Sequence, residues 1–190
     1  MSVEGVLRFP ELLARQLLEL ARDRRLRSRL LRQADGLHLG KGVEIRSPER
    51  LRLGRDVMID SRVLLHCGGM EWSGGDGWIH IGDHAYIGPN SVLFGAGGIE
   101  IGSSVLISPG VVITSHQHSF ARKDLPMREQ PTEFAPVVIK DNVWVGSNAT
   151  LLPGITVETG CAIGAGAVVT HSTSASGLYL GVPARRVRDL

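Results

Sequence analysis

The sequence predicts a mainly β fold in which short parallel strands wind into a regular coil, a β-helix. Three observations predict it: aliphatic residues recur at every sixth position, a small or β-branched residue follows four positions later, and glycine supplies 24 of the 190 residues. A period of six fits neither the 3.6 residues of an α-helix turn nor the alternation of a single strand. A strand and a turn repeated on each face of a coil give this period, and hexapeptide repeats are a sequence signature of β-helices.

The N-terminal segment, residues 1–37, precedes this pattern. Residues 11–34 are predicted to form a basic amphipathic helix that starts after Pro10, because leucines recur at helical spacing among many arginines. The leucines are Leu13, Leu17, Leu20, Leu26 and Leu30, and the arginines are Arg15, Arg22, Arg24, Arg25, Arg27, Arg29 and Arg32. Two interpretations stay open: the leucines pack on the coil or on a neighbouring subunit, or the helix lies on an anionic membrane surface.

The repeats occupy residues 38–170. The longest uninterrupted block has the aliphatic positions Ile139, Val145, Leu151, Val157, Ile163 and Val169. Shorter blocks begin at Ile81 and Ile101, and a weaker stretch begins at Leu39. We expect each aliphatic side chain to point inward and stack on its equivalent one coil away, with the glycine that often follows it relieving steric cost at the turn. Cys161 occupies one of the small positions, so we interpret it as a buried packing residue and not as a reactive thiol.

The repeat is interrupted in three places. Two extra residues bulge out near residues 95–98, and residues 68–77 form an irregular glycine-rich stretch that contains Trp72 and Asp76. Residues 116–136 carry charges and three prolines without any hexad pattern, so they are predicted to form an excursion loop. Long excursions from a rigid scaffold are where functional sites tend to lie.

The C-terminal tail, residues 171–190, places three arginines after the turn 181–184. These arginines are either solvated or form a clamp for an anion, since guanidinium groups suit phosphate.

The composition narrows the range of functions. A net charge of +2 gives no support for nucleic-acid binding, and two cysteines are too few for a disulfide framework. No run of 18 apolar residues is present, and the first residues lack the layout of a signal peptide. We therefore expect a cytoplasmic protein, with peripheral contact to the inner membrane face as an option for the basic helix.

The hexads, together with segments 142–147, 163–170 and 181–185, resemble those of the hexapeptide-repeat acyltransferases. The resemblance covers about residues 39–188 and is greatest to the galactoside, maltose and polysaccharide O-acetyltransferases. It implies a left-handed coil, a homotrimer, and acetyl-CoA or another acyl-CoA as donor, with no metal required. It also implies transfer to a hydroxyl of a sugar-containing acceptor, as in polysaccharide or glycolipid assembly.

The resemblance places the catalytic histidine on His116, where a hexad coil ends and the loop begins. A histidine of near-neutral pKa can take the proton of a hydroxyl as that hydroxyl attacks a thioester carbonyl. His118 orients His116, contacts the acceptor or has no role. Asn90 is either the counterpart of an acceptor-side asparagine or a polar turn residue.

The resemblance also places the CoA contacts along the late coils and the tail. They fall on Ser147, Ala165 (through its backbone), Thr170, Arg185 and Arg188. Trp144 either lines the donor groove or forms apolar surface at a subunit contact. Because a trimer places two subunits around each groove, one site is expected to draw His116 and the arginines from different chains.

Three alternatives remain at this stage. The first is an N-acetyltransferase of an amino sugar. The second is a zinc enzyme similar to the γ-class carbonic anhydrases, with His116 and His118 as ligands beside His66, His80 or His84. The third is a non-catalytic trimeric β-helix that serves as a scaffold.

Overall fold

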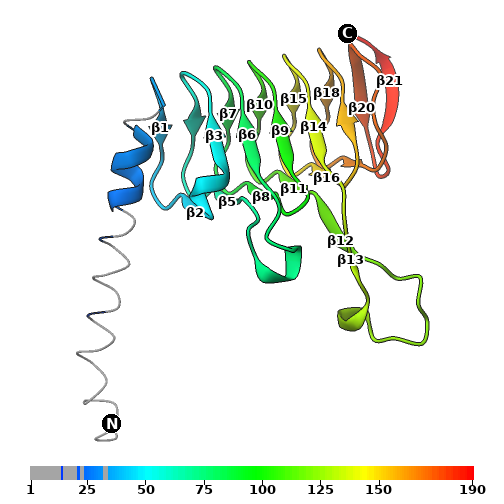
Figure 1. Ribbon diagram of the computed structural model, residues 1–190. Coiled ribbons are helices and arrows are strands. Elements are labelled where there is room, and N and C mark those ends of the chain that lie inside the picture. The colour runs from blue at the N-terminus through cyan, green and yellow to red at the C-terminus, as the bar shows by residue number, and fades with distance from the viewer. Residues whose placement is uncertain (1–13, 15–20, 22–23, 32–33) are drawn as a thin grey trace, which may run out of the picture.

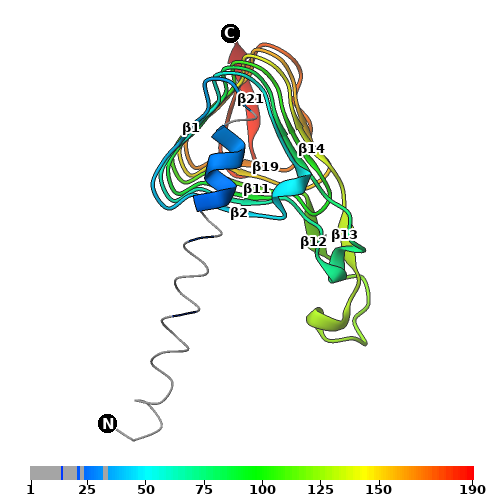
Figure 2. The same cartoon turned by 60° about the vertical axis from the view of Figure 1, so that its left-hand side comes forward.

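The computed structural model describes residues 14, 21, 24–31 and 34–190. Three parallel sheets form the sides of a left-handed β-helix, as predicted, and the coil has a triangular section (Figures 1 and 2). We call the three sheets side A, side B and side C, in the order in which the chain passes through them in one coil. Successive coils pair strand on strand along each side.

Each side is a ladder of short strands. Side A contains β1 (His38–Leu39), β4 (Met58–Ile59), β7 (Tyr86–Ile87), β10 (Leu106–Ile107), β15 (Trp144–Val145), β18 (Ala162–Ile163), β20 (Gly177–Leu180) and β21 (Arg185–Asp189). Side B contains β2 (Glu44–Arg46), β5 (Leu64–His66), β8 (Val92–Phe94), β11 (Val112–Thr114), β16 (Thr150–Leu151) and β19 (Val168–Val169). Side C contains β3 (Leu51–Leu53), β6 (Ile79–Ile81), β9 (Ile99–Ile101), β14 (Val137–Ile139) and β17 (Thr156–Val157).

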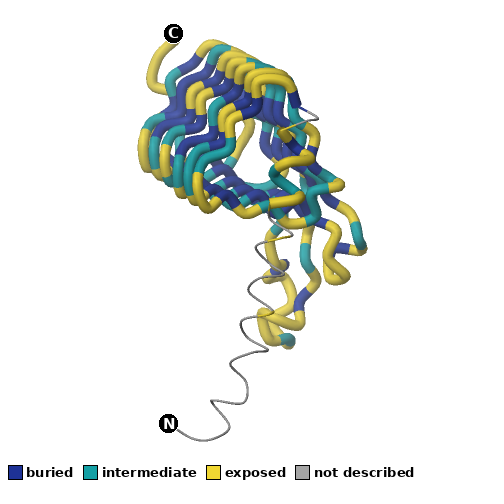
Figure 3. Tube along the Cα trace, turned by 90° about the vertical axis from the view of Figure 1, so that its left-hand side faces the viewer, coloured by how far each residue is buried: buried dark blue, intermediate teal, exposed yellow. Residues whose placement is uncertain are grey.

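The aliphatic hexad positions form the core, as predicted. On side A, Ile59, Ile87, Ile107, Val145 and Ile163 stand in register on consecutive coils and are fully buried. Their outward-facing neighbours along the strands stay more exposed, so buried and exposed stretches repeat in the same places coil after coil (Figure 3). This inward stacking removes a continuous apolar column from water, which is the main stabilising contribution.

The glycines that follow the aliphatic residues serve a different purpose from the one predicted. Gly88 and Gly146 do not adopt positive φ; instead, a Cβ on either would lie 2.6–2.7 Å from the backbone of the next coil. The left-handed backbone occurs two residues further on, where Asn90 and Asn148 adopt φ near 60° and Gly166 adopts 68°. Glycine after the aliphatic residue is therefore required by the close spacing of coils and not by the turn.

The described part of the N-terminal segment packs on the first coil. Residues 24–31 are helical, Leu30 is buried, and Leu26 packs against the core. The remaining predicted leucines, Leu13, Leu17 and Leu20, lie outside the described residues, as do Arg15, Arg22 and Arg32. Within the described residues, no helix is long and apolar enough to cross a membrane.

The C-terminal tail closes the other end of the coil. Strand β20 adds to side A in parallel with β18, and β21 returns antiparallel to β20. The Arg186 guanidinium donates hydrogen bonds to Asp189 and to backbone carbonyls of residues 174–176, so it holds this hairpin together.

Candidate active site

All three interruptions of the repeat occur at one corner, where the chain passes from side B to side C. We call it the B–C corner. Residues 67–78 leave between β5 and β6, residues 95–98 between β8 and β9, and residues 115–136 between β11 and β14. The two longer segments project from the same edge of the coil (Figure 1). We call residues 67–78 the short excursion and residues 115–136 the arm.

Ser115 fixes the point at which the arm begins. Its side chain is fully buried; the hydroxyl donates a hydrogen bond to the Phe94 carbonyl (2.8 Å) and accepts one from the Gly97 amide (2.9 Å). The Thr114 hydroxyl in turn donates to the His116 carbonyl (2.8 Å). These bonds tie His116 to the preceding coil, so its backbone is held by the rigid scaffold.

The arm corresponds to the predicted excursion loop of residues 116–136, and it starts as a two-stranded hairpin, which the prediction did not include. Strand β12 (His116–His118) pairs antiparallel with β13 (Thr132–Phe134), placing His116 opposite Phe134 and His118 opposite Thr132. Beyond the strands, the arm contains the short helix η3 (Met127–Glu129) and a buried Gln130 that bonds the Arg122 amide. His118 is exposed and is not among the rings around His116.

Three aromatic rings lie around the imidazole of His116, and the ring of a second histidine contacts two of those three. Trp72, from the short excursion, lies with its ring centroid 5.2 Å from that of His116, and Phe94 meets His116 edge-on at 6.0 Å. Phe134 lies 6.3 Å from His116 and stacks at 22° on Trp72. His66, a buried residue of the second coil, contacts both Trp72 and Phe94. Coils two, three and four and both projecting segments therefore meet at His116.

This environment favours the neutral form of the His116 imidazole. Burial disfavours the charged imidazolium and lowers the pKa of His116, and the positive charge that His66 and His118 carry when protonated lowers it further. The Nδ1 atom is buried and has no hydrogen-bond partner among the described residues. Nε2 is therefore the ring nitrogen that a substrate can reach. A neutral imidazole with one reachable nitrogen can accept a proton from a hydroxyl.

The glycine-rich bulge at 95–98 supports the short excursion. A Cβ on Gly77 would lie 2.6 Å from the Gly95 carbonyl oxygen, and a Cβ on Gly98 would lie 2.7 Å from the Trp78 ring. Glycine is needed at both positions, because a Cβ would collide with backbone at Gly77 and with the Trp78 ring at Gly98. The short excursion, which carries Trp72, therefore packs directly against the bulge at residues 95–98.

Three of the predicted donor residues, Ser147, Ala165 and Arg185, gather at a different corner. Ser147 and Ala165 follow β15 and β18, where side A turns into side B, and the Gly166 amide bonds the Ser147 carbonyl at 2.8 Å. The turn that leads to Arg185 lies beside them, since the Val168 amide bonds the Gly181 carbonyl. Within a coil, one strand of side B separates this A–B corner from the B–C corner, where His116 lies.

Asn90 also belongs to the A–B corner. It occupies the turn between β7 and β8, and its side-chain oxygen accepts a hydrogen bond from Arg62 at 2.8 Å. The structure therefore does not bring Asn90 to His116 within one chain. Asn90 adopts a positive φ of 60°, so this turn requires left-handed backbone. Asparagine suits the position because it tolerates that conformation better than most residues.

The other donor candidates are more dispersed. Trp144 stands on the outer face of side A, 52% exposed, with its indole N–H donating to Ser108. Thr170 follows β19 toward side C and bonds His171. Arg188 is exposed opposite Leu178, at the end of β20 away from Arg185. Within one chain, Ser147, Ala165 and Arg185 form a group, whereas Thr170 and Arg188 lie apart from it.

The histidines proposed for zinc do not converge. His66 lies near His116, but His80 stacks on Trp78 and His84 pairs with Asp56. Nowhere in the described ranges do three histidine, cysteine or acidic side chains group as metal ligands. The zinc alternative has no complete ligand set there.

Sequence reasoning missed most of the residues around His116. Phe94, Phe134 and His66 each follow or end a strand and carry no motif, so nothing in their spacing pointed to this cluster. Trp72 was noted only as part of an irregular stretch. The register of coils brings them together: His66 pairs with Phe94, and Phe94 with Thr114.

Comparison with protein families identifies the repeats. Residues 136–171 match the family described as bacterial transferase hexapeptide (six repeats), and residues 79–115 match the hexapeptide repeat of succinyl-transferase. Among curated proteins, the galactoside O-acetyltransferase of Escherichia coli is 33% identical over 112 residues, which is 59% of this chain and 54% of that protein. A tetrahydropyridine-dicarboxylate N-acetyltransferase of Staphylococcus aureus is 37% identical over 60 residues, 32% of this chain and 25% of that protein. The chain spans about half the length of curated relatives such as the first.

Solved structures share the same architecture. A hexapeptide-repeat acetyltransferase of Vibrio cholerae, solved with acetyl coenzyme A, is 29% identical, with a TM-score of 0.58 over 86% of this chain and 76% of that chain. An N-acyltransferase of Bacillus cereus, solved with dTDP and 3-hydroxybutyryl-CoA, is 22% identical, with a TM-score of 0.69 over 86% of this chain and 87% of that one. The second likeness establishes the fold alone.

Proposed function

We propose that this hexapeptide-repeat chain acts as the acetyltransferases that it resembles do, and that it transfers an acyl group, most simply acetyl, from acyl-CoA to a hydroxyl of a sugar-containing acceptor. One observation carries the proposal: the imidazole of His116 stands among aromatic rings at the mouth of the arm, with its pKa lowered by burial. A base of this kind accepts a proton at neutral pH because it is not already protonated.

His116 performs two proton transfers in this mechanism. It takes the hydroxyl proton at Nε2 as the acceptor oxygen bonds to the thioester carbonyl carbon. It then returns that proton to the CoA sulfur as the carbon–sulfur bond breaks, so the enzyme ends the cycle unchanged. The surrounding rings exclude water from the base, which favours the acceptor hydroxyl over hydrolysis of the thioester. Backbone N–H groups of the coil corner stabilise the charge that develops on the carbonyl oxygen.

The donor is proposed to bind at the A–B corner of a neighbouring copy. Ser147, Ala165 and Arg185 gather there, and the Arg185 guanidinium is exposed and able to pair with phosphate. His116 stands at a different corner of the same chain, so one chain cannot easily present both groups to one thioester. A closed homotrimer, in which the A–B corner of one copy faces the B–C corner of the next, removes this difficulty.

Mixed trimers test both the residues and the assembly. His116→Ala removes the base, whereas Ala165→Trp adds bulk at an exposed position of the A–B corner without entering the core. Each variant alone is expected to be inactive in a thiol-release assay with acetyl-CoA and a panel of sugars that carry hydroxyl or amino groups. Randomly mixed chains are expected to recover about a quarter of wild-type activity, because that share of interfaces combines an intact base with an intact groove. Stable mixed trimers without recovery would contradict a site shared between copies.

A further inference from the structure

A cavity of about 340 Å³ lies beside the ring cluster; Phe134 of that cluster lines it, and His116 does not. It opens between the short excursion and the base of the arm. Its lining comes from four coils: Arg50, Ser73, Asp76, Gly77, Trp78, Ala96, Gly97 and Phe134. The volume lies at the lower end of the range for small-molecule sites, which suits an occupant the size of a single sugar ring.

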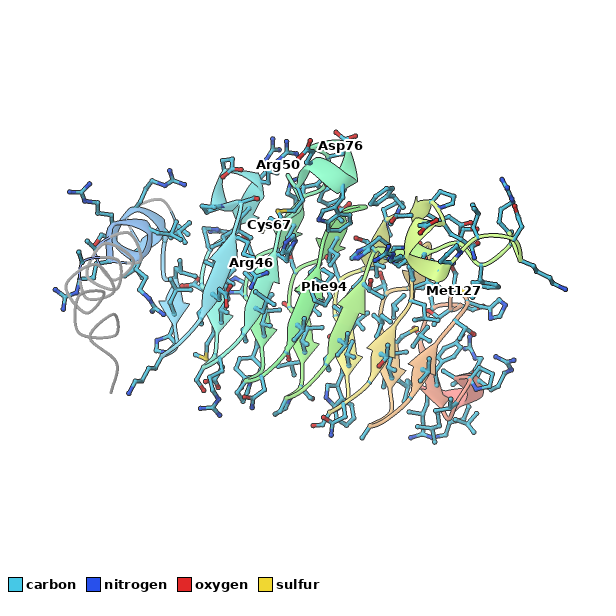
Figure 4. The ribbon with its side chains drawn as sticks, turned by 90° about the horizontal axis from the view of Figure 1, so that it is seen from below. Arg46, Arg50, Cys67, Asp76, Phe94 and Met127 are labelled. Atoms are coloured by element: carbon cyan, nitrogen blue, oxygen red, sulfur yellow. The ribbon has the colours of Figure 1, made fainter. Side chains whose placement is uncertain are left out.

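Two charged groups face this cavity and offset one another. The half-buried Arg50, at the end of η1 (Pro48–Arg50), donates one N–H to the Gly77 carbonyl at 3.0 Å, which leaves further donors of its guanidinium free. The exposed Asp76 makes no hydrogen bond or ion pair through its carboxylate with any described residue. Figure 4 shows Asp76 at the tip of the short excursion, near Arg50. The cavity therefore offers both donors and acceptors without a net charge.

The wall nearest the active site is aromatic. The Phe134 side chain lines the cavity, and its ring lies 6.3 Å from that of His116. The floor is rigid, because the Gly97 amide is held by Ser115 and Gly77 packs tightly against Gly95. A cavity lined by an aromatic ring, a guanidinium and a carboxylate matches a pyranose ring, which has apolar C–H faces and an edge of hydroxyls that both donate and accept.

We propose that this cavity binds the sugar ring next to the one that is acylated, so that the acceptor is an oligosaccharide of at least two rings. The inference rests on the proposed function. Phe134 both lines the cavity and lies 6.3 Å from the His116 ring, so a sugar ring held in the cavity leaves its neighbour within reach of the base. Asp76 and Arg50 bind hydroxyls of the held ring. The balanced charge of the site disfavours a phosphate or a simple cation as occupant.

The test uses a printed array of monosaccharides and oligosaccharides probed with the full chain in the presence of CoA. Wild-type protein is expected to bind glycans of two or more rings and to leave the component monosaccharides unbound. Asp76→Asn is expected to weaken this binding about tenfold, because the charged acceptor of the sugar hydroxyls is replaced by a neutral and weaker one. Glu71→Gln, an exposed acid of the same excursion that does not line the cavity, serves as the matched control and is expected to bind like wild type.

A second variant, at Phe134, tests the oligosaccharide subsite without relying on Asp76. Phe134→Leu keeps apolar bulk but removes the flat ring, and it should lose glycan binding while retaining acetyl-CoA binding by calorimetry. Equal binding of monosaccharides, undiminished binding by Asp76→Asn, or no glycan bound by wild type would overturn the oligosaccharide subsite. Glycan binding without any acyl-CoA binding or transfer would instead overturn the proposed function and leave the subsite standing.

Discussion

The indole of Trp72 lies over the imidazole of His116, with ring centroids 5.2 Å apart and planes tilted by 50°. The two residues are 44 positions apart in the chain and come from different excursions. Half of the Trp72 surface remains exposed, so this ring is both a wall of the site and part of its entrance. The Trp72 ring therefore affects both the access of substrate to His116 and, by burying the imidazole, the pKa of His116.

Replacing Trp72 tests this link. In Trp72→Ala, water reaches the imidazole more freely, so the cost of charging it falls and the pKa of His116 is expected to rise toward its ordinary value. The base then becomes protonated at a higher pH, and the acid limb of the activity profile moves to higher pH. NMR titration of the imidazole measures the shift directly. Phe120→Ala, an exposed aromatic of the arm, should leave the titration unchanged.

Removing the base itself should separate chemistry from binding. His116→Ala is expected to lower the rate of acyl transfer by about 10²–10⁴-fold, the usual contribution of a positioned general base. Acetyl-CoA binding by calorimetry should stay near the wild-type value, because the donor residues lie at the A–B corner. Transfer at the wild-type rate would remove His116 from the mechanism.

The two cysteines are expected to resist modification in the folded protein. Both are buried, and burial raises the pKa of the Cys67 thiol to about 12. Because the thiolate is the reactive form, Ellman's reagent at pH 8 should detect almost no thiol until denaturant is added, and then two per chain. Rapid reaction of one thiol in native protein would show that the coil opens locally at that cysteine.

Two glycine substitutions distinguish coil spacing from turn geometry. Gly146→Ala places a Cβ 2.6 Å from the backbone of the next coil, and it is expected to lower the free energy of unfolding by about 1–3 kcal/mol. Gly166→Asn meets no atom within 4 Å at its Cβ, and the same turn position holds Asn148 one coil earlier. It should therefore unfold at nearly the wild-type denaturant midpoint. Equal destabilisation by both would contradict the distinction.

The sequence by itself determined the coil. A strict period of six can bury Ile107, Val145 and Ile163 in one column only if each coil stacks in register on the last, so pattern and architecture are inseparable. The start of the arm after Thr114 was also readable, because the pattern stops there. His116 became a candidate through its resemblance to a family, on the basis of that position.

The tertiary structure alone decided what surrounds His116. Trp72 and Phe134 have no fixed spacing from His116, because each belongs to a segment that leaves the coil, and contacts between such segments leave no periodic signal. It also decided that Asn90 lies at another corner, because one strand of side B separates the two turns. A repeat fixes the direction in which each strand residue points. It does not fix how an excursion folds back, which depends on close packing such as that of Gly77 on Gly95.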